Sequence, residues 1–248
     1  MRLKFFLLLL LLAAAAAWGA PATGDDIPPD IATRIRATLH ERIPELQVKG
    51  LHQSPIPGLF ELDAGGELLY INDTGSLIFA GRIVDTKTRE DLSAARWNEI
   101  NAIDFNALPF DLAIKTVRGD GSRKLAVFAD PLCPYCRQLE QEMQGVTNIT
   151  IYTFLFPLET IHPGASVKAV NIWCAKDRSA TWSKWMLQKT EPDNTRCAGA
   201  PLDKLQTLGQ KLNVDSTPTM FTADGKRTRG AIKHNEIESL LASTGTHK

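Results

Sequence analysis

The sequence has few cysteines, no excess of charge of either sign, and no long apolar segment after its first residues. Four cysteines occur in 248 residues, and 28 basic residues balance 28 acidic ones. Proteins that bind nucleic acid usually carry a clustered basic face, and this composition gives no sign of one. No second apolar run approaches the roughly 20 residues that span a bilayer. We therefore expect a soluble mature chain that does not bind nucleic acid.

The first 22 residues have the pattern of a cleavable signal peptide. Residues 1–4 carry two basic side chains, and residues 5–17 form an apolar run rich in Leu and Ala. A basic start, a short apolar run and small residues at the cleavage site are typical of secretory signals. We expect cleavage after Ala22, with residues 15–17 as a second possible site. An uncleaved anchor is the alternative, but the run is short for one.

Residues 23–86 are predicted to form a small domain. Apolar residues at helical spacing predict a helix over residues 31–43, which Pro44 ends or bends. Short alternating segments separated by turn residues then predict a β-meander, at residues 59–63, 67–71 and 76–79. A domain of this size is marginally stable alone. We therefore expect an exposed sheet edge to pair with a second copy of the chain.

Residues 87–108 are predicted to contain a linker helix, and residues 109–248 a second domain. Thr88 is the expected N-cap of a helix that starts at residue 89 and ends near residue 104. In the second domain, residues 124–129 form a continuous apolar run, which is typical of a strand buried on both faces. A helical pattern and a further strand follow. A C-x-x-C motif therefore lies at a strand-to-helix junction of a β-α-β unit.

This motif, Cys133-Pro134-Tyr135-Cys136, is the candidate redox site. The amides and the dipole of a helix N-terminus stabilise a thiolate at Cys133 and lower its pKa below the ordinary value of about 8.5. The thiolate attacks a disulfide, and Cys136 resolves the mixed disulfide that forms. Pro134 is tolerated in the first helical turn. A zinc site, which needs compact ligand pairs, and a static disulfide are the alternatives, and we expect no metal or other cofactor.

The other two cysteines, Cys174 and Cys197, are predicted to form a structural disulfide. Its closed loop of about twenty residues contributes roughly 3 kcal/mol in the chain-entropy account. A second redox pair is the alternative, which is less favoured because neither cysteine follows a strand at a helix start. Thr217-Pro218 opens a predicted strand, where a proline is unusual. Frequency alone favours a trans bond, since only about 5–6% of X-Pro bonds are cis.

Three sequence blocks together resemble the periplasmic disulfide isomerases of the DsbC/DsbG type in the thioredoxin superfamily. They lie at residues 128–136, 172–177 and 216–218, and the resemblance extends over essentially the whole chain after the signal peptide. It implies an α+β fold with an N-terminal cystatin-like dimerisation domain, a linker helix, and a C-terminal thioredoxin-fold domain with a helical insertion. It also implies a homodimer whose redox sites face an uncharged cleft.

The resemblance also implies roles for particular residues. Cys133 and Cys136 match the redox pair, Thr217 and Pro218 match the substrate-binding cis-proline loop, and the remaining cysteines match the structural disulfide. The implied activity is the rearrangement of non-native disulfides in misfolded or oxidised exported proteins in the periplasm. A membrane electron donor of the DsbD type would keep the enzyme reduced.

The substrate preference stays open at this point. The Pro134-Tyr135 spacer is similar to the DsbG branch, whereas the cysteine at position 174 is similar to the DsbC branch. A reductase of sulfenylated cysteines and a cysteine-independent chaperone therefore remain alternatives. Leu132 and Tyr135 are predicted to offer apolar contacts to unfolded substrates. His162 is interpreted as a solvated loop histidine, with a place near the redox site as the alternative. Three tryptophans are interpreted as the core of the helical insertion: Trp173, Trp182 and Trp185.

Overall fold

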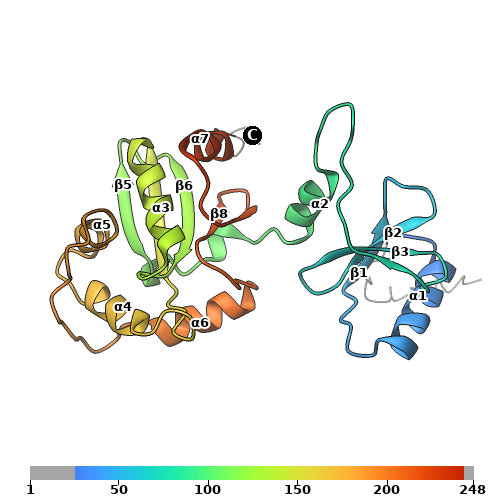
Figure 1. The fold of residues 1–248 in the computed structure, drawn as a ribbon, viewed down its shortest axis with the longest axis horizontal. Helices are drawn as coiled ribbons and strands as arrows, with labels where there is room; N and C mark the ends of the chain where they lie inside the picture. The colour runs from blue at the N-terminus through green and yellow to red at the C-terminus, as the bar shows by residue number, and fades with distance from the viewer. Residues whose placement is uncertain (1–25, 243–248) are drawn as a thin grey trace, which may run out of the picture. The chain divides into compact units, whose positions relative to one another are not determined.

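The computed structural model describes residues 26–242, so the predicted signal peptide lies outside the described residues. The described chain forms two compact units, which divide between Gly81 and Arg82. Both combine helices with a β-sheet (Figure 1). Within residues 26–242, no helix has the length and apolar character needed to cross a membrane.

The N-terminal unit packs one helix against a four-stranded antiparallel sheet. Ile35 and Leu39 lie one turn apart on the helix and are fully buried, together with Leu51 and Leu62 of the sheet. Pro28 is the N-cap of this helix and Pro29 is its first residue. A proline is tolerated there because the N–H groups of the first turn have no partner within the helix. The elements are α1 (Pro29–Arg42), β1 (Gly50–Gln53), β2 (Leu59–Asp63), β3 (Leu68–Asn72) and β4 (Ile78–Phe79), with the strands paired in sequence order.

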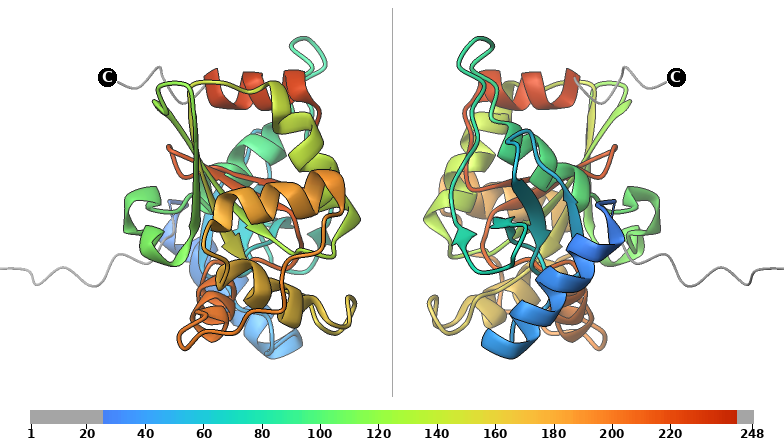
Figure 2. Two further views of the ribbon diagram at one scale, coloured as in Figure 1. Left: turned by 90° about the vertical axis from the view of Figure 1, so that its left-hand side faces the viewer. Right: turned by 90° about the vertical axis from the view of Figure 1, so that its right-hand side faces the viewer.

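The C-terminal unit is built on a five-stranded sheet of order β5-β7-β6-β8-β9. Only the central pair β6–β7 is parallel, as a β-α-β connection requires. The strands are β5 (Ile114–Arg118), β6 (Arg123–Ala129), β7 (Ile149–Leu155), β8 (Thr219–Thr222) and β9 (Arg227–Arg229). Helix α3 (Pro134–Glu142) follows β6 and lies beside the sheet in Figure 2. Three helices are inserted between β7 and β8, and one closes the chain: α4 (Ala165–Trp173), α5 (Arg178–Gln188), α6 (Leu202–Lys211) and the closing α7 (His234–Ala242).

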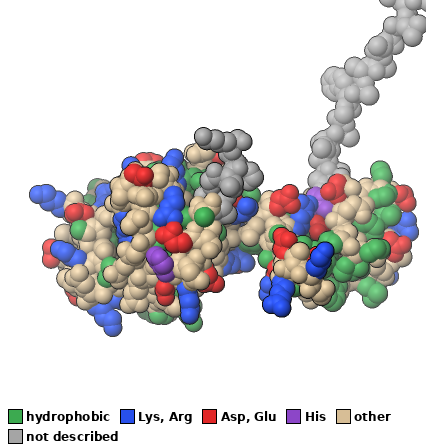
Figure 3. Space-filling view, turned by 90° about the horizontal axis from the view of Figure 1, so that it is seen from above, with side chains coloured by type: hydrophobic (Ala, Val, Ile, Leu, Met, Phe, Trp, Pro, Cys, Tyr) green, Lys and Arg blue, Asp and Glu red, His purple; other side chains and the backbone are tan. Residues whose placement is uncertain are grey.

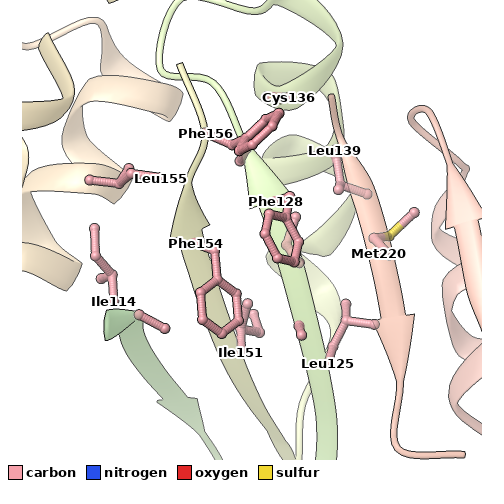
Figure 4. Close-up of a cluster of buried hydrophobic side chains, with 14 of the residues drawn as sticks. Ile114, Leu125, Phe128, Cys136, Leu139, Ile151, Phe154, Leu155, Phe156 and Met220 are labelled. Carbon is pink, nitrogen blue, oxygen red and sulfur yellow. The ribbon is translucent and has the colours of Figure 1, made fainter. Parts of the chain in front are cut away.

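The core of this unit is aromatic and centres on strand β6. The Phe128 ring stacks on Phe154 with centroids 5.0 Å apart, and meets Phe156 and Phe221 edge-on at 5.9 Å. Figure 4 shows Phe128, Phe154 and Phe156 in one cluster of buried side chains, together with Leu139 of α3. The last five residues of β6 are all buried. The prediction of a strand buried on both faces is therefore confirmed.

The linker helix is shorter than the sequence pattern predicts. α2 spans Leu92–Ile100, and its N-cap is Asp91, whose carboxylate accepts the N–H of Ala94, rather than Thr88. The Asp85 carboxylate instead accepts the N–H groups of Lys87 and Thr88, which closes a turn. Arg89 then has a φ of 63°, a left-handed conformation that interrupts any helix before Asp91.

Helix α2 is attached to the C-terminal unit. The guanidinium groups of Arg227 and Arg229 on β9 lie 5.3 Å and 4.8 Å from the centre of the Trp97 ring. Just after the helix, the Ile103 N–H donates to the Gly225 carbonyl at 3.0 Å. Cation–π contacts of this kind contribute on the order of 0.5–2 kcal/mol each. The helix therefore belongs with the sheet of the C-terminal unit.

Candidate redox site

The two cysteines of the C-x-x-C motif lie where β6 passes into α3. Cys133 is the N-cap of α3 and Pro134 its first residue, so the helix starts directly at the redox motif. Both cysteines are buried and neither is in a disulfide. The strand ends here because Pro131 has no N–H for the sheet ladder. The chain can then turn and point the first amides of α3 at the Cys133 sulfur.

The surroundings of Cys133 favour its thiolate. The Cys136 thiol, the largest contribution, donates a hydrogen bond that lowers the pKa of Cys133 to about 5, against the opposing effect of burial. The backbone amides of Tyr135 and Cys136 lower it further, as a helix N-terminus should. At neutral pH Cys133 is therefore a thiolate and a ready nucleophile.

Cys136 is shifted in the opposite direction. Burial raises the pKa of its thiol most, followed by its hydrogen bond to Cys133 and the negative charge of the Cys133 thiolate. A hydrogen bond from the Asp130 backbone opposes this rise. Cys136 therefore keeps its proton while Cys133 is ionised. It can become a nucleophile only after Cys133 has formed a bond and lost its charge.

The loop around Pro218 lies directly against Cys133, although 84 residues separate them in sequence. The bond between Thr217 and Pro218 is cis. The Cys133 Sγ, as a thiol, donates to the Thr217 carbonyl at 3.3 Å. Thr217 is itself buried, and a hydrogen bond from its side chain lowers the pKa of Cys133. The Thr217–Pro218 loop is thus part of the surroundings of the Cys133 sulfur.

The flanking residues differ in exposure. Tyr135 is 61% exposed, and Leu132 is half-buried against the core. Tyr135 therefore presents its ring to solvent beside the two cysteines of the C-x-x-C motif. On the face seen in Figure 3, acidic and basic side chains are interspersed over the molecule.

A disulfide joins Cys174 to Cys197, with Cα atoms 5.5 Å apart. It ties the end of α4 to the irregular segment that precedes α6. Neither cysteine is near the start of a helix that follows a strand, so the helix-terminus effect that activates Cys133 is missing there.

Removing this disulfide should destabilise the protein without disabling the redox pair. The bond closes a loop with a sequence separation of 23, so a Cys174→Ala/Cys197→Ala variant should lose about 3 kcal/mol of unfolding free energy. Urea unfolding measures the loss, and the reactivity of the Cys133 thiol in native buffer serves as the control. A loss below about 1 kcal/mol would show that the loop is already held by its other contacts.

Sequence reasoning missed a buried pair beside the motif. Asp130 is fully buried, and its carboxylate contacts the His162 imidazole, with Oδ2 and Nδ1 2.9 Å apart. The interpretation of His162 as a solvated loop histidine is wrong, because its side chain is only 21% exposed and is held by this contact. The position of Asp130 directly after a buried strand could have indicated that it lies near the site. Nothing in the sequence pairs it with a residue 32 positions away.

The three tryptophans are buried as predicted, but two of them also support the redox helix. The Trp182 indole N–H donates to the Glu140 carboxylate of α3 at 2.7 Å. The Trp185 indole N–H donates to the Pro131 carbonyl at 2.6 Å, two residues before Cys133. Burial raises the pKa of Glu140, and the indole hydrogen bond opposes this. The helical insertion therefore holds the redox loop in place.

Comparison with known proteins shows which family the chain is similar to. The family described as "Disulfide bond isomerase protein N-terminal domain" matches residues 13–94, and "Thioredoxin-like domain" matches residues 110–245. The "Probable thiol:disulfide interchange protein DsbC" of Bordetella pertussis is 37% identical over 210 residues, which cover 85% of this chain and 74% of that protein. The chain belongs to the DsbC family.

Two further relatives extend this result. The DsbC protein of Escherichia coli K12 is 24% identical over 209 residues, covering 83% of this chain and 86% of its own length. The crystal structure of a disulfide interchange protein from Neisseria gonorrhoeae is 34% identical, with a TM-score of 0.54, and covers 56% of this chain and 100% of its own. As a DsbC-family member, the chain is a thioredoxin-like thiol:disulfide oxidoreductase with disulfide isomerase function. The predicted α+β fold, with a DsbC N-terminal domain before the thioredoxin-like domain, is confirmed.

Proposed function

We propose that this chain rearranges non-native disulfides of exported proteins through Cys133 as the nucleophile and Cys136 as the resolving thiol. The opposite pKa shifts of the two sulfurs at the start of α3 are the observation that carries this assignment. The Thr217–Pro218 loop, whose carbonyl already faces the Cys133 sulfur, would bind the substrate backbone beside the attacked disulfide.

The reaction would proceed by two thiol–disulfide exchanges. The Cys133 thiolate attacks one sulfur of a substrate disulfide, and the other substrate sulfur leaves as a thiolate that takes up a proton. A different substrate thiolate then attacks the mixed disulfide and releases Cys133 unchanged, so isomerisation transfers no net electrons. If Cys136 attacks instead, the substrate leaves reduced by two electrons and a Cys133–Cys136 disulfide remains.

This second route defines the partners that the enzyme needs. Each resolution by Cys136 leaves an oxidised enzyme, which must receive two electrons before it can act again. We assign this supply to a membrane donor of the DsbD type. The location we propose is the periplasm, reached through cleavage of the signal peptide of residues 1–22.

We further propose that the N-terminal unit forms a homodimer through its β4 edge. β4 pairs only with β3 among the described strands, so one row of its backbone groups has no strand partner. Leu77, Ile78 and Phe79 at this edge are exposed, with 53% of the Phe79 side chain accessible. An apolar edge strand of this kind is a template for pairing with another chain.

The test is reactivation of a scrambled, fully oxidised multi-disulfide protein by the reduced mature chain. We expect recovery of activity with the native chain and essentially none with Cys133→Ala, because only the Cys133 thiolate starts the exchange. The Cys174→Ala/Cys197→Ala variant is the matched control, since it loses two cysteines but keeps the redox pair.

The other outcomes identify the alternatives. No recovery from a chain whose Cys133 thiol is free and reactive would contradict the isomerase. It would favour a reductase of sulfenylated cysteines, the alternative suggested by the similarity of the Pro134-Tyr135 spacer to the DsbG branch. Recovery that persists in Cys133→Ala would instead indicate a chaperone that acts without its cysteines.

A further inference from the structure

The Asp130 carboxylate holds together two segments that surround the redox cysteines. Its Oδ1 accepts the Leu132 N–H at 2.6 Å, within the loop that leads to Cys133. Its Oδ2 accepts the Leu158 N–H at 2.7 Å and contacts His162 Nδ1 at 2.9 Å, both on the segment between β7 and α4. A fully buried carboxylate is tolerated only when its lone pairs are satisfied, and three donors achieve this here.

The backbone of the same residue contacts both cysteines. The Asp130 carbonyl accepts the Cys133 N–H at 3.2 Å. A hydrogen bond from its backbone also reaches the Cys136 sulfur. Any shift of Asp130 would therefore move the surroundings of the nucleophile and of the resolving thiol together.

His162 is placed by a segment with its own hydrogen bonds. The His162 N–H donates to the Leu158 carbonyl at 2.8 Å, which closes a turn. The Glu159 carboxylate accepts the N–H groups of Gly164 and Ser166 and ties this turn to the start of α4. The Asp130 Oδ2 is an acceptor in this contact, so the imidazole donates from Nδ1. The histidine therefore presents a donor at a position set by its own turn.

We propose that Asp130 and His162 form a positioning pair for the resolving step. His162 holds the Asp130 carboxylate, and Asp130 holds the loop so that Cys136 reaches the Cys133 sulfur in a mixed disulfide. This inference rests on the proposed roles of the two cysteines. The resolving step needs the anchor most, because a substrate bonded to Cys133 pulls on the loop whose geometry Cys136 requires.

Two substitutions at position 162 separate the donor from the bulk of the side chain. In His162→Asn, the amide nitrogen is bonded to Cγ as Nδ1 is in histidine, so a donor to Asp130 is kept. His162→Leu keeps much of the bulk but removes the donor. The control is His234→Leu, because the His234 ring contacts the Glu142 carbonyl at the far end of α3.

Reduced protein is mixed with 5,5′-dithiobis(2-nitrobenzoate), and release of its aromatic thiolate is followed in time. Attack by Cys133 releases one aromatic thiolate and leaves the other in a mixed disulfide. Attack by Cys136 on the Cys133 sulfur releases the second and forms the Cys133–Cys136 disulfide. We expect His162→Leu to slow the second release roughly tenfold. A tenfold change in rate corresponds to losing part of the free energy of one charge-assisted hydrogen bond. The first release should change by less than about twofold.

His162→Asn and His234→Leu should release the second equivalent within about threefold of the native rate. Equal rates of the second release in the native chain, His162→Leu and His162→Asn would overturn the positioning pair. Equal slowing of that release in His162→Leu and His162→Asn would overturn it as well. Failure of the native chain to release a second equivalent at all would be a different result. It would contradict the resolving role of Cys136 and therefore the proposed function itself.

Discussion

Alkylation of Cys133 should show an inflection near pH 5, roughly three to four pH units below that of an ordinary cysteine. Only the thiolate reacts with iodoacetamide, so the pH profile of the rate reports its pKa. Mass spectrometry of the reduced chain at a series of pH values identifies the alkylated cysteine. An inflection above pH 8 would contradict the electrostatics described for the start of α3.

Two variants at position 136 test the cause of this shift. The hydrogen bond from the Cys136 thiol is the largest contribution to the low pKa of Cys133. Cys136→Ala removes the donor and should raise the inflection, whereas Cys136→Ser supplies a hydroxyl donor and should raise it less. Equal inflections in the two variants would assign the shift to the helix amides alone.

The same pKa makes the stability of the reduced protein depend on pH. A thiol whose pKa is lower in the folded than in the unfolded chain stabilises the fold above its folded pKa, and the effect is lost as pH falls through it. The gain therefore grows from about pH 5 to about pH 8.5 and reaches roughly 3 kcal/mol at pH 7. The oxidised protein has no such thiol. As pH rises from about 5 to about 8.5, the melting temperature of the reduced form should therefore increase relative to that of the oxidised form.

Cys136→Ser should trap substrates on Cys133. With the resolving thiol removed, the mixed disulfide can be released only by a thiol of the substrate or of the buffer. An intramolecular thiol has a large effective molarity, so the lifetime of the complex should increase roughly a hundredfold or more. Non-reducing electrophoresis of the protein mixed with an oxidised substrate measures the complex.

Two controls give this result its meaning. Addition of dithiothreitol must dissolve the complex, and Cys133→Ala must form none. A complex of equal lifetime in the native chain and in Cys136→Ser would contradict the resolving role of Cys136. A complex that survives dithiothreitol would not be a mixed disulfide.

Local sequence patterns were enough to predict most of the fold. The apolar run at residues 124–129 became β6 because a strand covered on both faces has no polar side to show. The linker helix was predicted too long, because helical spacing of apolar residues says nothing about the Asp85 turn or the left-handed Arg89. Short side-chain-to-backbone bonds of this kind compete with helix formation and leave no periodic signal.

The sequence by itself determined the family, the order of the two domains, and the position of the C-x-x-C motif at a strand-to-helix junction. These features depend on neighbouring residues and on their spacing, which the chain displays directly. Only the tertiary structure decided what surrounds the cysteines: the Thr217 carbonyl, the Asp130–His162 pair and the Trp185 indole bound to Pro131. Each of these contacts joins residues far apart in sequence, and folding brings them together through burial of a shared core that no local pattern encodes.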